Sequence, residues 1–182
     1  ITYVGFHGPY TVSAAGDFNN DTFADVLLGA RLASPFGRSA AGEAFVLYGT
    51  DNPVSNVMQL DSVEINPALG IQLHGARAGE YFGNSVSGGA DLNGDGCADV
   101  MVSAILANAT GSDGLVRQSA GISYVIYGGS NAHSIDMRSF VSGSVGFRIL
   151  GAGVGDRAGR GISAGGDFNY DGVPDIIVGA PQ

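Results

Sequence analysis

The chain has 182 residues, among them 31 glycines, 17 Asp or Glu and eight Arg or Lys, and its formal net charge at pH 7 is −9. This acidic charge excludes nucleic acid as an expected partner, because phosphate binding needs a basic face, and no apolar run has the length of a transmembrane segment. The single cysteine, Cys97, excludes an intramolecular disulfide framework.

Three acidic segments repeat along the chain in the pattern Asp-x-Asn-x-Asp-x-x-x-Asp. They occupy residues 17–25, 91–99 and 167–175, about 75 residues apart. Apolar runs flank each copy on both sides in the same order. Self-similarity at a fixed period indicates a repeat architecture, in which each copy forms one structural unit.

Each repeat contains short apolar runs bounded by Gly, Asp and Asn, and none carries a helical stripe. Runs of this length, rich in β-branched and aromatic residues, predict strands. The run after each acidic segment is apolar throughout, so we expect that strand to be buried on both faces. In chain order, the expected strands span residues 12–16, 26–30, 42–49, 70–75, 86–90, 100–104, 121–128, 146–151, 162–166 and 176–180.

Four strands per repeat predict an all-β fold made of β-propeller blades, each of four antiparallel strands. The first blade unit is expected at residues 1–76, the second at 77–152 and the first half of a third at 153–182. About 2.4 units cannot close a ring of about 4 to 8 blades. We therefore expect residues 1–182 to form a partial propeller, as in a fragment or processed product. Its open edge is expected to meet further propeller units, from the same chain or from neighbouring copies.

Polar stretches account for the remaining length of each repeat. Residues 31–41 and 106–120 are expected to form surface loops inside the blades. Residues 50–68 and 129–144 are expected to be variable connections between the third and fourth strands.

The acidic segments have the composition of cation-binding loops. They place side-chain oxygens at positions 1, 3, 5 and 9, and the main-chain carbonyl at position 7 can complete the shell. Such hard ligands suit Ca²⁺, which takes about 6 to 8 oxygens. Gly96 and Gly172 at position 6 permit a positive φ, whereas Thr22 carries strain there, so the first of three sites is expected to be the weakest.

Two other interpretations of these loops are weaker. Asp, Asn and Gly also form plain turns, which would explain one loop as well as a metal site does but not three copies in register. EF-hand and dockerin loops need a Glu at position 12 and flanking helices, whereas Leu28, Val102 and Val178 stand there, inside apolar runs.

The order of Phe82-Gly83, the acidic run at 91–96 and Gly179-Ala180-Pro181 resembles the FG-GAP repeat of integrin α-subunit propellers and of many surface proteins. The resemblance covers nearly the whole chain. It implies a propeller, usually seven-bladed, with Ca²⁺ in the loop between the first two strands of a blade. The Phe-Gly pair is replaced by Gly8-Pro9 in the first unit and by Ala158-Gly159 in the third.

The resemblance also implies a set of calcium ligands in each loop. Carried over position by position, these are Asp17, Asn19, Asp21, the carbonyl of Phe23 and Asp25; Asp91, Asn93, Asp95, the carbonyl of Cys97 and Asp99; and Asp167, Asn169, Asp171, the carbonyl of Val173 and Asp175.

Catalytic motifs in the sequence lack their structural context, and the chain is expected not to be an enzyme. Residues 161–165 match G-x-S-x-G, yet Ser163 repeats Ser13 and Ser87 in expected strands, and no helix follows. Residues 153–158 match a dinucleotide-binding pattern without a βαβ unit around them. His74 lies in a strand run and is expected to be packed or edge-exposed, and not a metal ligand.

Cys97 and two glycosylation motifs remain to be placed. A buried, inert thiol is the expected state of Cys97, and an intermolecular disulfide is the alternative. The sequons at Asn20 and Asn108 predict glycans if the protein is secreted by a eukaryote, with Asn108 the better site because it lies in a polar loop.

These observations predict a non-enzymatic, calcium-stabilised propeller segment, extracellular or at a cell surface, that serves adhesion or structural assembly through a protein or glycan ligand. Two alternatives stay open. One is a carbohydrate-binding module on a propeller face, and the other is a propeller accessory to a hydrolase or lyase that lies outside this chain.

Overall fold

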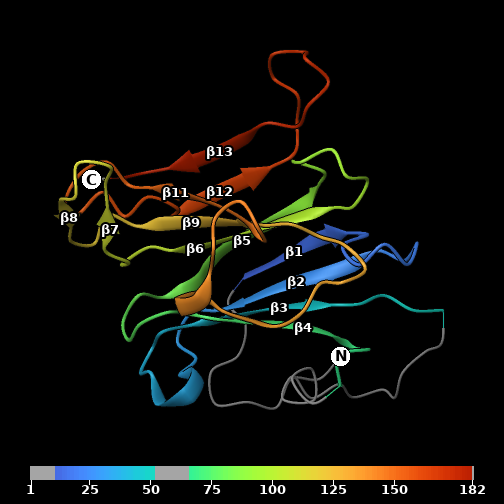
Figure 1. Cartoon of the computed structure of the whole chain (residues 1–182), viewed down its shortest axis with the longest axis horizontal. Helices are drawn as coiled ribbons and strands as arrows, with labels where there is room; N and C mark the ends of the chain where they lie inside the picture. The colour runs from blue at the N-terminus through green and yellow to red at the C-terminus, as the bar shows by residue number, and fades with distance from the viewer. Residues whose placement is uncertain (1–10, 52–65, 182) are drawn as a thin grey trace.

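The computed structural model describes residues 11–51 and 66–181 (Figure 1). Residues 1–10, 52–65 and 182 lie outside this description, and with them the Gly8-Pro9 pair and most of the connection expected at 50–68. The described residues form β-strands and two short 3-10 turns. Within these ranges, no helix has the length and hydropathy to cross a membrane.

The first repeat forms one antiparallel sheet whose strands follow one another in chain order. It consists of β1 (Thr11–Gly16), β2 (Asp25–Ala30), β3 (Glu43–Leu47) and β4 (Gly70–His74). A fifth strand, β10 (Ile135–Asp136), comes from the second repeat and pairs in parallel with the outer edge of β4. We call these five strands the first sheet.

The second repeat forms a sheet with the same order. It consists of β5 (Phe82–Ala90), β6 (Asp99–Ala104), β9 (Ile122–Ile126) and β11 (Gly146–Leu150), each antiparallel to its neighbour. We call these four strands the second sheet.

The third repeat contributes the antiparallel pair β12 (Gly161–Ala164) and β13 (Ile176–Gly179). The three sheets stack in chain order, with β1 and β12 on either side of β5 (Figure 1). The amide of Ala164 donates to Ser87 Oγ at 2.9 Å and joins the pair to the second sheet. The predicted all-β fold, an incomplete propeller of antiparallel blades, is therefore confirmed.

The strands that follow the acidic loops differ in burial. Every residue of β6 is buried, as predicted, because sheets lie on both of its sides. The prediction is wrong for β2, where Val26 is 37% exposed, and for β13, where Ile177 is 52% exposed. Within the described residues, β2 has a packed sheet on one side alone, and β13 is an edge strand.

The polar stretches contain local structure that the sequence did not predict. A 3-10 turn, η1 (Pro35–Gly37), lies in the loop at 31–41. A short hairpin of β7 (Ala109–Thr110) and β8 (Val116–Arg117) lies in the loop at 106–120. A second 3-10 turn, η2 (Met137–Ser139), follows β10 directly.

The main core lies between the first and second sheets. Phe82, Tyr124 and Phe140 form a chain of edge-to-face rings, with centroids 5.6 Å and 5.3 Å apart. Each buried Val, Leu, Ile or Phe side chain contributes about 1.5–3 kcal/mol through removal from water. The fully buried apolar side chains of this core include Phe18, Leu27, Val46, Ile71, Leu73, Val100, Val102 and Ile126.

Residues 134–140, which we call the return segment, cross back from the second repeat to the first. Ser134 Oγ accepts from the amide of Gln72 at 3.0 Å, and β10 follows directly along β4. Asp136 then accepts two hydrogen bonds from the guanidinium of Arg38, at 2.8 Å and 3.0 Å. Arg38 also donates to the carbonyl of Ala76 at 3.1 Å. The return segment therefore ties the two sheets together at their outer edges.

We expect Arg38→Ala to lower the free energy of unfolding by about 1–3 kcal/mol, because the side chains of Arg38 and Asp136 are only 12% and 24% exposed. Chemical denaturation with urea measures this loss. Arg117→Ala is the matched control: it breaks an exposed pair with Asp113 and should cost much less than Arg38→Ala. Equal losses in the two variants would contradict the role given to the return segment.

The effect of Arg38→Ala should also depend on pH. Burial by itself raises the pKa of Asp136, but hydrogen bonds from Arg38 and Arg138 together hold it well below its ordinary value. A lowered carboxyl pKa stabilises the fold above the unfolded pKa of about 3.9, and this contribution is lost as the pH falls further. The difference between Arg38→Ala and the unchanged protein should therefore shrink between pH 5 and pH 3.

Candidate metal centre

The first-position aspartate of each acidic loop accepts hydrogen bonds from main-chain amides of the same loop. In the second loop, Asp91 Oδ1 accepts from the amides of Gly94 at 2.7 Å and Asp95 at 3.2 Å, while Oδ2 accepts from Gly96 at 2.9 Å. The first and third loops repeat the bonds from positions 5 and 6 at 2.7 to 3.0 Å. The three loops therefore share one backbone shape.

Positions 3, 5 and 7 are connected in the same way in all three loops. Asn93 Oδ1 accepts from the amide of Asp95 at 3.0 Å, and its Nδ2 donates to Asp95 Oδ2 at 2.8 Å. The amide of Cys97 donates to Asp95 Oδ1 at 2.8 Å, and this bond, with that from Asn93, lowers the pKa of Asp95. The same bonds link Asn19, Asp21 and Phe23, and Asn169, Asp171 and Val173.

Two of the ninth-position aspartates, Asp25 and Asp99, are buried and join the loops to the sheets. Asp99 accepts from the amide of Leu92 at 2.8 Å and from that of Gly128, after β9, at 2.9 Å. Asp25 makes the equivalent pair of bonds in the first sheet, at 2.9 Å and 2.8 Å. Asp175 is half-buried and accepts one such bond, from the amide of Phe168 at 2.7 Å.

Burial sets the electrostatics of these aspartates. Loss of solvent raises the pKa of Asp99 to about 6, despite the two amides, and the neighbouring carboxylates of Asp95 and Asp91 raise it further. Burial raises the pKa of Asp25 in the same way. A buried carboxylate close to two others is an unfavourable group of like charges, which a bound cation would relieve.

The backbone at loop position 6 follows the prediction from the sequence. Gly96 and Gly172 have φ values of 90° and 87°, and Thr22 has a φ of 77°. A β-branched residue is rare in this left-handed region, so the first loop is strained where the other two are not. The lower calcium affinity expected of the first loop stays a prediction.

The donor set of each loop fits calcium by its chemistry. All five expected donors are oxygens, and a carboxylate oxygen that accepts one amide keeps a second lone pair; Asp91 Oδ1, which accepts two, is the exception. Within the described ranges, no three His, Cys, Asp or Glu side chains form a metal-binding group by themselves. In each loop an asparagine side-chain oxygen and a main-chain carbonyl would have to contribute, and the ninth-position aspartate already accepts at least one main-chain amide. Calcium binding therefore stays a prediction.

Two glycines belong to this site although sequence analysis did not single them out. Gly49 and Gly128 donate their amides to Asp25 and Asp99. A Cβ atom at either glycine would collide with a main-chain carbonyl oxygen, so a larger residue cannot approach. The repeat pattern contains them, because the repeated segments 42–49 and 121–128 both end in Gly.

Cys97 and His74 are both buried in the structure. The thiol of Cys97 is buried, as expected, and burial raises its pKa. His74 is packed, as predicted, with 5% of its surface exposed and its Nδ1 2.9 Å from Glu43 Oε1.

The G-x-S-x-G motif lies in a strand and its connection, the dinucleotide-binding pattern lies in turns, and the two sequon asparagines lie on the surface. Ser163 lies in β12, which is followed by an acidic loop and a strand, and residues 153–158 form turns between β11 and β12. The sequon residues Asn20 and Asn108 are both exposed. Glycosylation of either asparagine stays a prediction.

A protein-family model described as the FG-GAP repeat matches three segments of the chain. They span residues 8–47, 82–126 and 158–182, which together make up more than half of the sequence. Each matched segment contains one acidic loop with the strands on either side of it.

Curated proteins with related sequences include integrin α chains. Integrin alpha-E of Mus musculus is 35% identical over 97 residues, covering 51% of this chain and 8% of the integrin. Integrin alpha-PS5 of Drosophila melanogaster is 42% identical over 108 residues, covering 59% and 9%. A phosphatidylinositol-glycan-specific phospholipase D of Bos taurus is 29% identical over 191 residues, covering 98% and 19%. The chain thus spans less than a fifth of the length of each of these relatives.

We expect Asp99→Asn to flatten the pH dependence of stability when calcium is removed by a chelator. A raised carboxyl pKa gives stability that is present below the unfolded pKa of about 3.9 and lost as the pH rises through about 6. Discounted for partial solvation, the change in unfolding free energy between pH 4 and pH 7 should be about 1–2 kcal/mol smaller in Asp99→Asn. Urea denaturation across this range measures it. Parallel curves for Asp99→Asn and the unchanged protein would contradict the prediction.

Proposed function

The chain belongs to the FG-GAP repeat family, and from this premise we propose that it is a calcium-stabilised, non-enzymatic segment of an extracellular or cell-surface β-propeller that serves adhesion or structural assembly. The observation that carries the proposal is the hydrogen-bond network shared by the three acidic loops, which orients the same oxygen donors in each. Integrin α chains among the relatives support the adhesion part.

Each acidic loop would hold one calcium ion through the side chains at positions 1, 3, 5 and 9 and the main-chain carbonyl at position 7. When bound, the ion would supply positive charge between carboxylates that otherwise repel one another. The chain's own residues connect this charge to the fold, since Asp25 and Asp99 reach the amides of Gly49 and Gly128 beyond the third strand of their sheets.

The stabilisation would be large compared with the stability of an ordinary domain. Extracellular calcium modules bind with a Kd of roughly 10⁻⁴ to 10⁻³ M. At about 1 mM calcium and a Kd of about 10⁻⁴ M, each site adds roughly 1.4 kcal/mol. Three sites add about 4 kcal/mol, against a typical total of 5–15 kcal/mol. Calcium would therefore act as a structural cross-link.

Further propeller units are the proposed partners of the third repeat. In the described part of the chain, β13 pairs with β12 and with no other strand, which leaves one of its edges open. Ile177 in β13, and Phe168 and Val173 in the acidic loop between β12 and β13, are each more than half exposed. An additional strand or blade, from the same chain or from a neighbouring copy, would pair with that edge and cover these side chains.

A propeller accessory to a hydrolase is the second candidate. It is favoured by the match to the bovine phospholipase D, which extends over 98% of this chain. In that case the catalytic part would lie outside these 182 residues. Phospholipase activity of the full-length protein, lost when a part outside these residues is deleted, would favour this candidate over adhesion.

We expect calcium to raise the melting temperature by about 8–16 °C, because about 4 kcal/mol is gained at about 2–4 °C per kcal/mol. Thermal denaturation with 1 mM calcium and with EGTA measures the change, and titration calorimetry should give three calcium ions per chain. The double variant Asp91→Asn, Asp95→Asn should lose one ion, while the exposed variant Arg160→Ala keeps all three. A melting curve that EGTA leaves unchanged would refute calcium stabilisation.

A further inference from the structure

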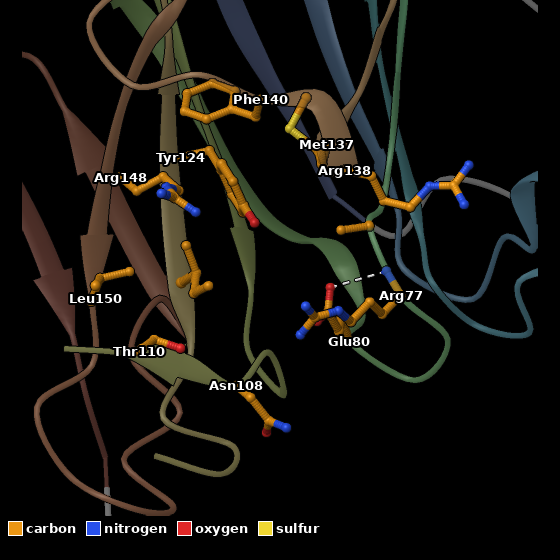
Figure 2. A pocket seen from close by; sticks show the side chains of 12 residues that line it. Arg77, Glu80, Asn108, Thr110, Tyr124, Met137, Arg138, Phe140, Arg148 and Leu150 are labelled. Atoms are coloured by element: carbon orange, nitrogen blue, oxygen red, sulfur yellow. Dashed lines mark hydrogen bonds between the residues drawn. The ribbon is translucent and has the colours of Figure 1, made fainter. Parts of the chain in front are cut away.

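A cavity of about 450 Å³ lies between the second sheet and the return segment, away from the acidic loops (Figure 2). One wall is the face of β9 and β11, a second is the chain between β4 and β5, and a third is η2. The volume lies within the range of about 300–1,000 Å³ for pockets that bind small molecules. The cavity is formed by segments about 70 residues apart in the sequence, so no local sequence motif predicts it.

The register of β9 and β11 places a charged and an apolar patch side by side on the first wall. Arg148 lies directly opposite Tyr124, and Leu150 lies directly opposite Ile122. Arg148 is exposed, and its guanidinium makes no hydrogen bond or ion pair within the described residues. The cavity therefore has one guanidinium that is free to bind an anion.

Tyr124 is 4% exposed, and its ring is held between Phe82 and Phe140. Its hydroxyl extends toward the centre of the cavity in Figure 2 and has no hydrogen-bond partner among the residues that the structure describes. Burial raises the pKa of Tyr124 to about 12, so the phenol stays a neutral donor at physiological pH. The hydroxyl reaches the cavity, where it can donate a hydrogen bond to a ligand.

Glu80 supplies an acceptor on the opposite wall. It is 8% exposed, and its Oε2 accepts from the amide of Arg77 at 3.1 Å. The Arg77 guanidinium partly offsets its charge, as Arg138 offsets that of Asp136. The cavity thus combines the exposed guanidinium of Arg148, the neutral hydroxyl donor of Tyr124 and the buried carboxylate acceptor of Glu80.

This combination selects among ligand classes. An apolar ligand would leave Tyr124 and Arg148 unpaired, and a ligand without hydroxyl groups would offer no donor to the carboxylate of Glu80. A cation would meet three guanidinium groups. A ligand with one carboxylate and several hydroxyls satisfies all the groups, because the hydroxyls can donate to Glu80 while the carboxylate faces Arg148.

We propose that this cavity binds an acidic monosaccharide unit, a uronic acid, with its carboxylate on Arg148 and Tyr124 and a hydroxyl on Glu80. The apolar face of the sugar ring lies against Ile122 and Leu150, and Asn108 at the rim contributes a polar contact. The site is independent of the proposed calcium function, since no lining residue belongs to an acidic loop. Loss of calcium binding and loss of sugar binding are therefore separate results.

Titration calorimetry of the full-length protein with D-glucuronate tests the proposal. The protein is made without glycosylation, so that Asn108 is unmodified, and is kept in excess calcium. We expect saturable binding, with D-glucose and acetate at least about tenfold weaker, because each lacks one half of the recognised chemistry. Raising the salt concentration should weaken glucuronate binding.

Two variants and a control connect the binding to the cavity. Arg148→Gln should weaken glucuronate binding about tenfold or more, because a charged hydrogen bond is lost. Tyr124→Phe keeps the ring stack and should weaken binding several-fold. Arg160→Ala removes an exposed arginine outside the cavity and should change nothing.

The proposal is overturned by any of three results. These are no saturable glucuronate binding at up to about 10 mM, equal affinity for glucose or acetate, and unchanged affinity in both Arg148→Gln and Tyr124→Phe. Circular dichroism of each variant checks that the variant is folded. Because Arg148 is exposed and Tyr124→Phe preserves the packed ring, at least one variant is expected to be informative.

Discussion

A buried aspartate that joins three pieces of backbone is the constraint on which each complete sheet depends. Asp99 receives the amide at the start of its own loop and the amide of Gly128 beyond the third strand, and Asp25 does the same in the first sheet. The carboxylate thus fixes the position of the loop on the sheet. The donor beyond the third strand is glycine because its Cα lies close to a main-chain carbonyl oxygen, which leaves no space for a Cβ atom. Burial disfavours the charged form of this same carboxylate. The hydrogen bonds that hold the sheet together therefore depend on a charge that its surroundings destabilise. A divalent cation in the loop would stabilise that charge.

Much of the fold and the candidate site could be predicted from the sequence because the information is local and repeated. Alternation of apolar runs and acidic loops gave the strands, their order and the positive φ at position 6. Burial was less predictable, since β2, β6 and β13 have similar sequences but different neighbours. The return segment, the β7–β8 hairpin and the cavity could not be predicted, because each depends on contacts between residues far apart in the chain or on short polar segments with weak intrinsic preference.

The return segment accounts for two features of the molecule at once. By crossing from the second repeat to β4, it buries Met137 and Phe140 against the core and sets Asp136 beside Arg38. It also packs Phe140 on Tyr124 of β9 and lines one side of the cavity. The connection therefore holds neighbouring blades together and creates the one concave surface where Arg148, Tyr124 and Glu80 meet. Residues 136–140 therefore both connect the two sheets and line one side of the cavity.

The parallel pairing of β10 with β4 has a consequence for how copies of the protein meet in solution. It covers the outer edge of β4 at Leu73 and His74, so that this end of the edge is closed to a strand of another molecule. The outer edge of the second sheet, β11, has no such cover among the described residues, and it carries the charged Arg148 at its centre. A charge in the middle of an edge strand discourages a second strand from docking there. The two outer edges thus resist self-association by different means, one by a covering strand and the other by a guanidinium.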